Sequence, residues 1–393
     1  MGDDMEYRLE ELFDLQMGKT PSRSVTEYWE SGNNKWISIA DLSKCGKYIY
    51  NTKECLSDIA VSESSIKQIP ANTVVMSFKL SIGKTAITSE PMYSNEAIMS
   101  FRDRKLVQLL PEYIYYLLLS KNWDDGTNKA VMGKTLNKAT LSKVKVNIHS
   151  MQEQQEIVYV LNQATALIEL HQQQLQKLDE LVKARFVELF GDPIVNSCKL
   201  PVVTLGEISG LITKGASPSC QGFSYINDKS QTLFVTSENV REGYLDLSSP
   251  KYVEDGFNVK QKRSVIHKGD FLINIVGASI GRAAQFNLDC KANMNQASAL
   301  VRIKDRRINE KYLLTYLNSD KAQRMYDSMK SDTGRANLSL QDISNLSILL
   351  PPIKKQIEFD QFVNQVDKSK AAVQKSLDEA QLLLDSLMQQ YFE

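Results

Sequence analysis

The chain has 393 residues, which at about 100–200 residues per domain predicts two or three domains. Its 47 basic residues balance its 47 acidic ones, so no global charge draws it to nucleic acid, and polyanion binding would need local patches. Five cysteines without a CxxC pair, no apolar stretch of roughly 18–20 residues and an acidic start without signal-peptide features predict a reduced, cytoplasmic protein with no membrane partner.

The first half of the chain predicts a globular domain followed by a long helix. An apolar, strand-like run at Val74–Met76 precedes the loop Ser81-Ile82-Gly83-Lys84, and an apolar helix is expected from Glu112 to Ser120. Gly133-Lys134 then precedes an alternating run that we expect to form a strand, because its apolar residues recur with a period of two: Leu141, Val144, Val146 and Ile148.

The second half repeats these features in the same order. The run Phe271–Ile273 precedes Ser279-Ile280-Gly281-Arg282, and a helix is expected from Lys311 to Ser319. Gly334-Arg335 then precedes a second alternating run, which consists of Ile343, Leu346, Ile348 and Leu350. The repeat, with a period of about 200 residues, therefore predicts two domains of one architecture.

Two long helices follow the two domains. A shift of 202 residues superimposes their apolar positions, including the four-residue steps from His171 to Leu175 and from Val373 to Leu377 that interrupt the heptad. The chain begins Met1-Gly2-Asp3 as though it continued from Phe392, so the repeat is nearly circular. We expect an α+β fold with two mixed α/β globular domains, separated by two long helices packed as an antiparallel coiled coil with pseudo-twofold symmetry.

Charge follows the same division of the chain. Residues 1–150 carry 19 basic and 18 acidic residues, and residues 193–350 carry 20 and 15. The helices are acidic: residues 151–192 include 3 basic and 7 acidic residues, and residues 351–393 include 5 basic and 7 acidic ones. Contacts with DNA are therefore expected on the globular domains, and contacts with proteins on the helices.

The motifs of the common nucleic-acid enzymes are missing from the sequence. Gly-Lys-Thr occurs three times, but the glycine that a Walker loop needs five positions earlier is replaced by Phe13, Phe78 and Asn128. We find no glycine-rich methyltransferase loop, no cluster of nuclease carboxylates and no metal-ligand spacing among the three histidines. The sequence therefore predicts a binding protein that has no catalytic site, metal or cofactor of its own.

The order of these features resembles the specificity subunit of type I restriction-modification enzymes, over nearly the whole chain. The resemblance rests on the tandem of domain and helix, on Leu189-Phe190-Gly191-Asp192-Pro193 at the end of the first helix, and on Leu350-Pro351-Pro352-Ile353 before the second. The first copy departs from the family at His149-Ser150-Met151, where prolines are usual, so the resemblance does not fix the start of that helix.

The resemblance implies that residues 1–150 and 193–350 are target-recognition domains, each reading one half of a bipartite, asymmetric site in double-stranded DNA. The helices would set the spacer between the halves and dock two methyltransferase (modification) subunits. Methylation, ATP hydrolysis and cleavage would belong to those and to restriction/translocase subunits, which would bind S-adenosylmethionine, ATP and Mg²⁺ in place of this noncatalytic chain.

Base readout needs polar side chains in loops, with lysine or arginine anchoring phosphates. The repeat offers three matched sets: Lys19, Thr20 and Arg23 against Lys214 and Ser217; Lys84 against Arg282; and Lys134 and Lys138 against Arg335 and Asn337. Alternatively, the neighbouring glycines only form turns and the basic side chains are simply solvated. Trp36 and Trp123 are expected in cores, while Tyr225 could press against a base methyl group.

Two other functions stay open. The chain could be a coiled-coil adaptor or scaffold with two protein-binding heads, which a test of DNA binding would distinguish from a specificity subunit. It could also be a stand-alone hydrolase, which activity of the purified chain would reveal.

Overall fold

The computed structural model describes residues 5–30, 32–79, 81–123, 128–130, 133–329 and 337–392, with the backbone alone at 128–130 and 133–135. The chain forms two compact units, both of mixed α/β structure. Unit 1 consists of Met1–Gln173 and Gln374–Glu393, and unit 2 of Gln174–Val373. The two long helices, α6 (Met151–Phe190) and α12 (Ile353–Phe392), each contribute to both units.

Unit 1 contains a five-stranded sheet in the order β2-β9-β6-β7-β4, in which all neighbours are antiparallel except β4 and β7. Its strands are β2 (Phe13–Met17), β9 (Ile98–Asp103), β6 (Val74–Ser77), β7 (Thr85–Thr88) and β4 (Tyr48–Ile49). A second sheet has the order β5-β3-β8, with β5 at Glu54–Leu56, β3 at Asn34–Ile37 and β8 at Tyr93–Ser94. Two antiparallel ribbons complete the unit, β1 (Met5–Arg8) with β12 (Lys145–Ile148), and β10 (Asn128–Ala130) with β11 (Gly133–Thr135).

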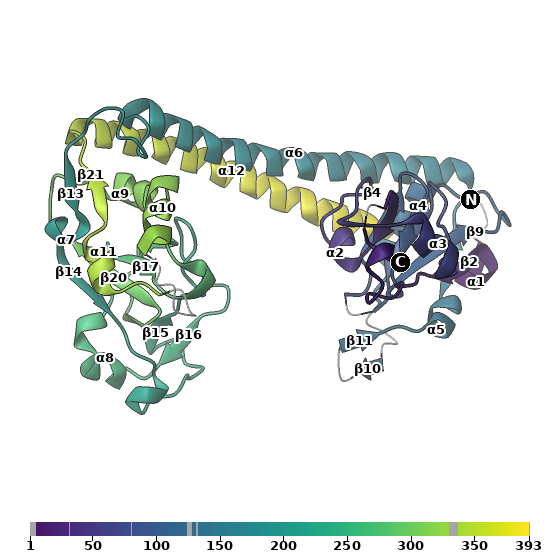
Figure 1. Cartoon of the computed structure of the whole chain (residues 1–393), viewed down its shortest axis with the longest axis horizontal. Coiled ribbons are helices and arrows are strands. Elements are labelled where there is room, and N and C mark those ends of the chain that lie inside the picture. Colours follow the sequence, from purple (N-terminus) through teal and green to yellow (C-terminus); the bar gives the residue numbers. More distant parts are fainter. Residues whose placement is uncertain are drawn as a thin grey trace. The chain divides into compact units, whose positions relative to one another are not determined.

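Short helices connect the strands of unit 1. They are α1 (Leu9–Leu12), the 3₁₀ turn η1 (Thr26–Tyr28), α2 (Ile39–Leu42), α3 (Asp58–Glu63), α4 (Pro111–Ser120) and α5 (Lys138–Ser142). Helix α4 is the longest of them, and its buried side chains complete the core below the large sheet. The hairpin β10–β11 lies on the side of unit 1 that faces away from α6 (Figure 1).

Unit 2 repeats this strand order. The sheet β14-β20-β17-β18 corresponds to β2-β9-β6-β7, the sheet β16-β15-β19 to β5-β3-β8, and the ribbon β13–β21 to β1–β12. The strands are β13 (Val202–Thr204), β14 (Ser209–Lys214), β15 (Thr232–Val235), β16 (Lys251–Val253), β17 (Phe271–Asn274), β18 (Ala283–Gln285), β19 (Ala292–Met294), β20 (Ser298–Ile303) and β21 (Ser347–Leu349). The prediction that the chain contains one architecture twice is therefore confirmed.

The connections of unit 2 also follow those of unit 1, with one addition. The helices are α7 (Leu205–Ile208), α8 (Gly256–Lys260), α9 (Glu310–Leu317), α10 (Asp320–Met329) and α11 (Leu340–Ser344), and the 3₁₀ turns are η2 (Ser219–Gln221), η3 (Lys262–Ser264) and η4 (Gly277–Ser279). Helix α10 has no helical counterpart in the described part of unit 1. In Figure 1, α8, β15 and β16 lie at the end of unit 2 that is remote from α12.

The expected strands and helices before the long helices are confirmed in part. Strands β6 and β17 contain the apolar runs predicted for them, and α4 and α9 occupy the predicted helical segments. The prediction that each alternating run forms a strand is wrong for the first half of the run, because Leu141 lies in α5 and Ile343 in α11. The side chains of Asn137 and Ser339 cap these helices by accepting hydrogen bonds from backbone amides three residues on, so each run starts as a helical turn.

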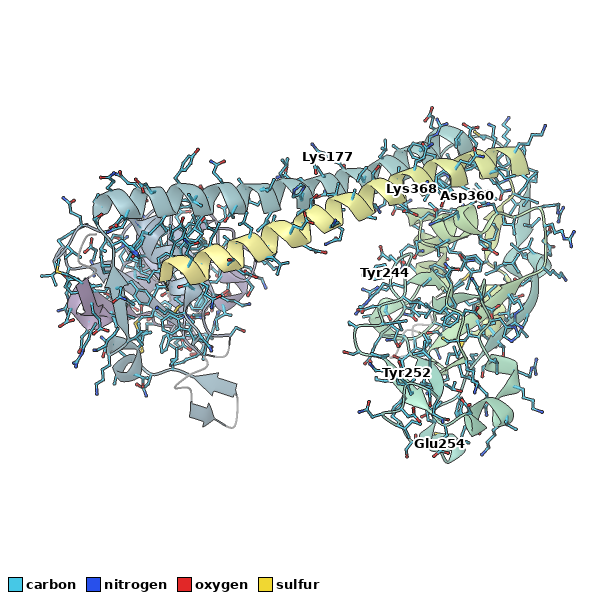
Figure 2. The ribbon with its side chains drawn as sticks, turned by 180° about the vertical axis from the view of Figure 1, so that it is seen from behind. Lys177, Tyr244, Tyr252, Glu254, Asp360 and Lys368 are labelled. Atoms are coloured by element: carbon cyan, nitrogen blue, oxygen red, sulfur yellow. The ribbon has the colours of Figure 1, made fainter. Side chains whose placement is uncertain are left out.

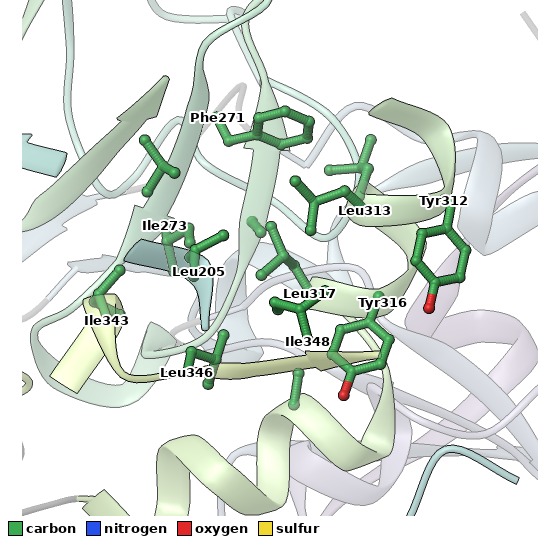
Figure 3. Packing of buried hydrophobic residues seen from close by; sticks show 14 of the residues in the cluster. Leu205, Phe271, Ile273, Tyr312, Leu313, Tyr316, Leu317, Ile343, Leu346 and Ile348 are labelled. Carbon is green, nitrogen blue, oxygen red and sulfur yellow. The ribbon is translucent and has the colours of Figure 1, made fainter. Parts of the chain in front are cut away.

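The core of unit 2 gathers side chains from α9, β17, β21 and α11 (Figure 3). Tyr312 and Leu313 of α9 are fully buried, as are Phe271 of β17 and Ile348 of β21. Fully burying an aliphatic or aromatic side chain of this size stabilises the fold by about 1.5–3 kcal/mol. The Tyr312 hydroxyl donates a hydrogen bond to the carbonyl of Leu349 at 2.8 Å, so its polar atom is satisfied inside the core.

The long helices begin in two different ways. Before α6, Ser150 and Glu153 form a reciprocal capping box, in which the Ser150 amide and hydroxyl both donate to the Glu153 carboxylate. These hydrogen bonds hold the pKa of Glu153 below its usual value. Before α12, Pro351 and Pro352 end β21, and the helix starts at Ile353. A polar cap thus does in the first copy what the prolines do in the second.

One buried glutamine near the start of each long helix fastens it to its unit. In unit 1, Gln154 accepts a hydrogen bond from the amide of Leu110 at 3.0 Å and donates to the carbonyls of Gln108 and His149, both at 3.0 Å. In unit 2, Gln356 accepts from the amide of Asn309 at 2.7 Å. It donates to the carbonyls of Arg307 at 2.9 Å and Pro351 at 2.7 Å. Each glutamine therefore fixes the segment that leads into α4 or α9.

Each unit also takes in the far end of the other long helix. In unit 1, Leu384, Leu387 and Tyr391 of α12 pack on the core that contains Ile157 and Leu161 of α6. Because the last turns of α12 meet the first turns of α6, the two segments run antiparallel within this unit. No helix in the described ranges is long and apolar enough to cross a membrane.

In unit 2 the contact is made by the last turns of α6 and the first turns of α12. The rings of Phe186 and Phe190 lie 5.4 and 5.6 Å from that of Phe359, measured between centroids. At the helix surface, Arg185 forms an ion pair with Glu358 at 2.6 Å. These segments are antiparallel as well, and their aromatic contacts join both helices to the core of the unit.

Candidate nucleic-acid interface

The candidate residues emerge at one end of each large sheet. In unit 1 this end, called here the loop end, is where β2 and β6 finish and where β7 and β9 begin. In unit 2 it is where β14 and β17 finish and where β18 and β20 begin. The small sheets share this end, because β8 and β19 lead directly into β9 and β20. The first two sets that the sequence singled out therefore lie at the same end of each unit.

Backbone hydrogen bonds hold the loops of this end together in the same way in both units. In unit 1 the amide of Phe78 donates to the carbonyl of Ala97 at 3.0 Å, and the amide of Leu136 to that of Phe78 at 3.0 Å. In unit 2 the amide of Ile275 donates to Ala297 and that of Leu338 to Ile275, both at 2.9 Å. The segments after β6 and β17 thus lie at the centre of the loop end.

Close approach of two loops requires a glycine at the first set. A Cβ atom on Gly18 would overlap the carbonyl oxygen of Ser94, and one on Gly215 would overlap that of Met294. From these glycines the structure makes Thr20 the equivalent of Ser217. Lys214, however, is the last residue of β14, where β2 has Met17, so it is not the equivalent of Lys19.

In unit 1 the first set is bound within its own unit. Lys19 donates to the carbonyl of Ser64 at 2.6 Å, and the Thr20 hydroxyl donates to the carboxylate of Glu96. Arg23 forms two hydrogen bonds to Glu54, at 2.6 and 2.9 Å, and its guanidinium lies 3.6 Å from the ring centroid of Trp29. Arg23 therefore already holds a carboxylate, with which a phosphate would compete.

The pair of Arg23 and Glu54 shifts both titrations. The hydrogen bond from Arg23 lowers the pKa of the Glu54 carboxyl, and the same bond raises the pKa of Arg23.

In unit 2, Ser217 lies within hydrogen-bond distance of Ser219, at 3.0 Å between the hydroxyl oxygens, and Lys214 is exposed.

The second set is equivalent in the two units. Ser77 and Asn274 each receive an amide hydrogen bond from the following glycine, Gly83 or Gly281, and each donates to the residue after that glycine, Lys84 or Arg282, at 2.9 Å. Both glycines have positive φ, of 87° and 92°. The order Ser-Ile-Gly followed by a basic residue is therefore closed by the same backbone hydrogen bonds in both units, although the loop of unit 2 is one residue longer.

An aromatic ring lies under each of these turns. A Cβ atom on Gly83 would come within 2.9 Å of Cδ1 of Trp123, and one on Gly281 would clash with the ring of Tyr326. Trp123 is buried, as expected from the sequence, while Tyr326 belongs to α10. Neither ring was expected below a basic turn, because each comes from a segment about 40 residues farther along the chain.

The two basic side chains of this set differ in their partners. The Lys84 ammonium donates to the hydroxyl of Ser43, just after α2. Arg282 is partly exposed, and its guanidinium has no side-chain partner among the residues that the structure describes. Arg282 is therefore the more available of the two for an anionic ligand.

The third set lies partly outside the described residues. Lys138 is exposed at the first position of α5, and Asn337 is exposed and bridges to Val276 in the loop after β17. The backbone of Lys134 pairs with that of Lys129 in the hairpin β10–β11, but its side chain lies outside the description. Arg335 lies outside the described residues altogether.

One element of the loop end was not predicted from the sequence, the turn Arg241-Glu242-Gly243-Tyr244 after β15. The amide of Arg241 donates to the carbonyl of Tyr244 at 3.0 Å, and that of Gly243 to the carbonyl of Ala283 at 2.9 Å, beside Arg282. Its signal was a lone glycine between polar residues, which is weak alone and has no match in the first copy. Tyr225, the aromatic that was expected in a loop, is half exposed and packs on Phe234.

In the ranges that the structure describes, no three His, Cys, Asp or Glu residues gather in a way that could hold a metal ion. A cavity of about 440 Å³ in unit 1 lies beyond the opposite end of the large sheet, where Leu106, Ile148 and His149 are among the residues that line it. The arrangement at the loop end offers hydrogen-bond donors, acceptors and cations from rigid turns, which suits recognition of a polyanion with readable edges.

Comparisons with known proteins agree with this description. The family model of the type I restriction modification DNA specificity domain matches residues 1–180 and 200–381. The chain is 25% identical over 366 residues to the specificity subunit of the type I restriction enzyme MjaIX from Methanocaldococcus jannaschii, covering 88% of this chain and 82% of that protein. It is 22% identical over 329 residues to the EcoBI specificity subunit from Escherichia coli, covering 77% and 68%.

Solved structures with the same fold cover nearly the whole chain. A chain solved in work on complex assembly and conformational transition of the type I R-M system has a TM-score of 0.57 at 16% identity, covering 98% of this chain and 96% of that one. The S subunit from M. genitalium has a TM-score of 0.50 at 14% identity, covering 100% and 97%. At these identities the likeness concerns the fold.

Proposed function

Because this chain belongs to the family of type I restriction-modification DNA specificity subunits, we propose that its two units read the two halves of a bipartite, asymmetric site in double-stranded DNA. Residues 1–150 and 193–350 are then the target-recognition domains. Each presents its loop end to a groove, with base edges read by polar side chains and phosphates held by basic ones.

One observation carries this proposal: the polar and basic side chains that differ between the two units lie at the loop end of the same arrangement of strands in each unit. The turns at Lys84 and Arg282 have equivalent backbone hydrogen bonds, so the side chains that differ between the units start from equivalent places. Two readers with one frame and different side chains suit a target whose two halves differ in sequence.

The long helices, predicted from the sequence at residues 151–192 and 351–393, are proposed to act as the spacer between the two readers. Antiparallel contacts of α6 with α12 within each unit support an antiparallel coiled coil with pseudo-twofold symmetry. A continuous helix of 40 residues is about 60 Å long, which exceeds one turn of B-DNA, about 34 Å. Half-sites roughly a turn apart, with unread base pairs between them, fit that length.

The same helices would dock two methyltransferase subunits. Leu181 of α6 and Leu383 of α12 are equivalent under the 202-residue shift, and both are about half exposed, at 47% and 51%. One of them belongs to each unit, so each unit offers an exposed apolar side chain at the same place on its helix. Methylation, ATP hydrolysis and cleavage would then be carried out by the methyltransferase and restriction/translocase subunits, and this chain would be noncatalytic.

The proposal is tested by expressing the chain with its methyltransferase partner in a host without modification and mapping methylated bases over the genome. A split motif with a fixed unread gap is the expected result. A complex that forms but methylates no split motif would refute the proposal and would favour an adaptor with two protein-binding heads.

Lengthening both helices tests their role as the spacer. One helical turn of residues is inserted near Gln173 in α6 and near Val373 in α12, where the heptad is interrupted. The expected result is a longer gap between two unchanged half-sites. An unchanged gap would contradict the role of the helices as a ruler, while leaving the reading of two half-sites intact.

A further inference from the structure

The turn Arg241–Tyr244 of unit 2 is anchored at its base and exposed at its tip. Gly243 has a φ of 87°, as the third residue of a type II turn requires, and Val240 and Leu245 pair across the base of the turn. Val240 is fully buried, so the stem is anchored in the hydrophobic core while the tip is exposed.

A network of side-chain hydrogen bonds fixes the stem of the turn. The carboxamide of Asn239 accepts from the amide of Thr236 at 2.9 Å and donates to the carbonyl of Asp246 at 2.9 Å, while the Asp246 carboxylate pairs with Arg241 at 3.2 Å. The buried Asn274 donates to the carbonyl of Ser237 at 2.9 Å and so ties this segment to β17. A turn held at so many points is ordered before any ligand arrives.

Tyr244 is the side chain that this turn presents. It is 59% exposed, and its hydroxyl has no hydrogen-bond partner within the described parts of unit 2. The preceding residue, Gly243, donates its amide to Ala283, the neighbour of Arg282. Figure 2 shows Tyr244 at the edge of the unit, apart from Tyr252 and Glu254. An exposed aromatic residue therefore lies on a turn whose backbone is hydrogen-bonded to the residue after Arg282, at the loop end.

Unit 1 has a different structure at the corresponding sheet edge. There β4 pairs in parallel with β7, and the Lys84 ammonium donates to Ser43. Among the described residues of unit 1, no turn with an exposed tyrosine lies beside Lys84. The exposed tyrosine of that region, Tyr50, follows β4 and lies beyond the end of β7, at the opposite end of the sheet from Lys84. Units 1 and 2 thus differ in structure beside the equivalent residues Lys84 and Arg282.

We infer that Tyr244 is a specificity-determining residue of unit 2, whose ring packs against a base edge, such as a thymine methyl group, in the half-site that this unit reads. The inference rests on the proposed function. Arg282, whose neighbour Ala283 accepts the hydrogen bond from the amide of Gly243, supplies the positive charge that holds the adjacent backbone phosphate or a guanine edge. An aromatic ring offers a large contact area at little conformational cost, because only two of its side-chain torsions must be fixed.

The test uses the full chain in complex with its methyltransferase and measures equilibrium binding to a panel of duplexes. Each duplex carries one base-pair change in one of the two half-sites. Tyr244→Ala is expected to reduce discrimination by about ten- to a hundredfold at one or two adjacent positions of the half-site read by unit 2. Discrimination in the other half-site should stay unchanged. Tyr244→Phe should keep the wild-type profile, because the ring remains.

Two variants serve as matched controls. Tyr50→Ala removes an exposed tyrosine at the far end of the sheet in unit 1, and Val259→Ala removes an exposed apolar side chain from α8 in unit 2. Both should leave the whole profile unchanged.

The outcomes separate this inference from the function on which it rests. A wild-type complex that discriminates at no base pair would refute the proposed function itself. A wild-type profile that Tyr244→Ala leaves unchanged would refute only the role of Tyr244. Loss of all binding by Tyr244→Ala would also refute that role, because contact with one base pair accounts for a limited part of the affinity of a large interface.

Discussion

Replacing Gln356 of α12 by leucine should loosen α9, the helix that carries Tyr312 and Tyr316 in the core of unit 2. Gln356 is fully buried and makes three hydrogen bonds, to the backbone of Asn309, Arg307 and Pro351. Leucine keeps most of the apolar volume but can make none of them. At about 1 kcal/mol for each hydrogen bond, the loss comes to about 3 kcal/mol, and more where a buried group is left unpaired.

Hydrogen exchange can locate this loss. The amide of Asn309 and the capping interaction of its side chain with Tyr312 start α9, so the amides of Glu310–Leu317 should exchange faster in the variant. A loss of about 3 kcal/mol corresponds to exchange roughly a hundredfold faster, where opening is at equilibrium. The peptides of unit 1 should be unaffected, and they serve as an internal reference.

The matched control is Gln361→Leu, which changes an exposed glutamine on the same helix. It should alter the exchange of α9 by less than about twofold, in line with surface substitutions. The reciprocal variant, Gln154→Leu, should speed the exchange of α4 and spare α9. If Gln356→Leu changed exchange in α9 no more than Gln361→Leu does, the three hydrogen bonds would not be what holds this helix, and the reasoning would be wrong.

Three further predictions concern charge and thiol chemistry. A plot of log affinity for DNA against log salt concentration has a negative slope, and Arg282→Ala should make it shallower by about 0.9. An unchanged slope would show that Arg282 contacts no phosphate. Because Arg23 lowers the pKa of Glu54, this carboxylate adds stability that is complete above its unfolded pKa and lost as pH falls through the lower folded value. Unit 1 should therefore weaken on acidification in urea titrations, and Glu54→Gln should flatten that dependence; an equally steep loss would contradict the pairing. Burial raises the pKa of the Cys45 thiol, so a thiol reagent at about pH 8 should label Cys45 more slowly than the exposed Cys198, whereas equal rates would speak against it.

The features that the sequence predicted well are those with a local physical cause. Gly83 and Gly281 need positive φ, so the glycine and the basic residue after it stay together in both copies, and the structure confirms that Lys84 and Arg282 are equivalent. The long helices carry an apolar periodicity that is readable over 40 residues. Local geometry and periodicity of this kind are visible in a single sequence.

The features that the sequence did not predict depend on contacts between distant segments. The pairing of Arg23 with Glu54 joins residues 31 positions apart, and nothing in the sequence near Arg23 announces it. Lys214 and Lys19 are not equivalent, because Lys214 precedes the close-approach glycine Gly215, whereas Lys19 follows Gly18. The caps at Asn137 and Ser339 were readable, but the period-two pattern that begins four residues after each of them favoured a strand, and the capping hydrogen bonds prevailed.

The way in which the loop end is held explains how one frame can present two different surfaces. At Lys84 and Arg282 the turn is fixed by backbone hydrogen bonds, by a glycine and by an aromatic ring beneath it, none of which uses the basic side chain. The side chain at that position can therefore change without unfolding the turn. The same holds at Tyr244, where Asn239 and the backbone fix the turn and the ring itself makes no hydrogen bond with the described residues. One set of groups thus holds each turn, and a different set of side chains faces outward. A protein needs this separation if its two halves are to differ in what they recognise while keeping one fold.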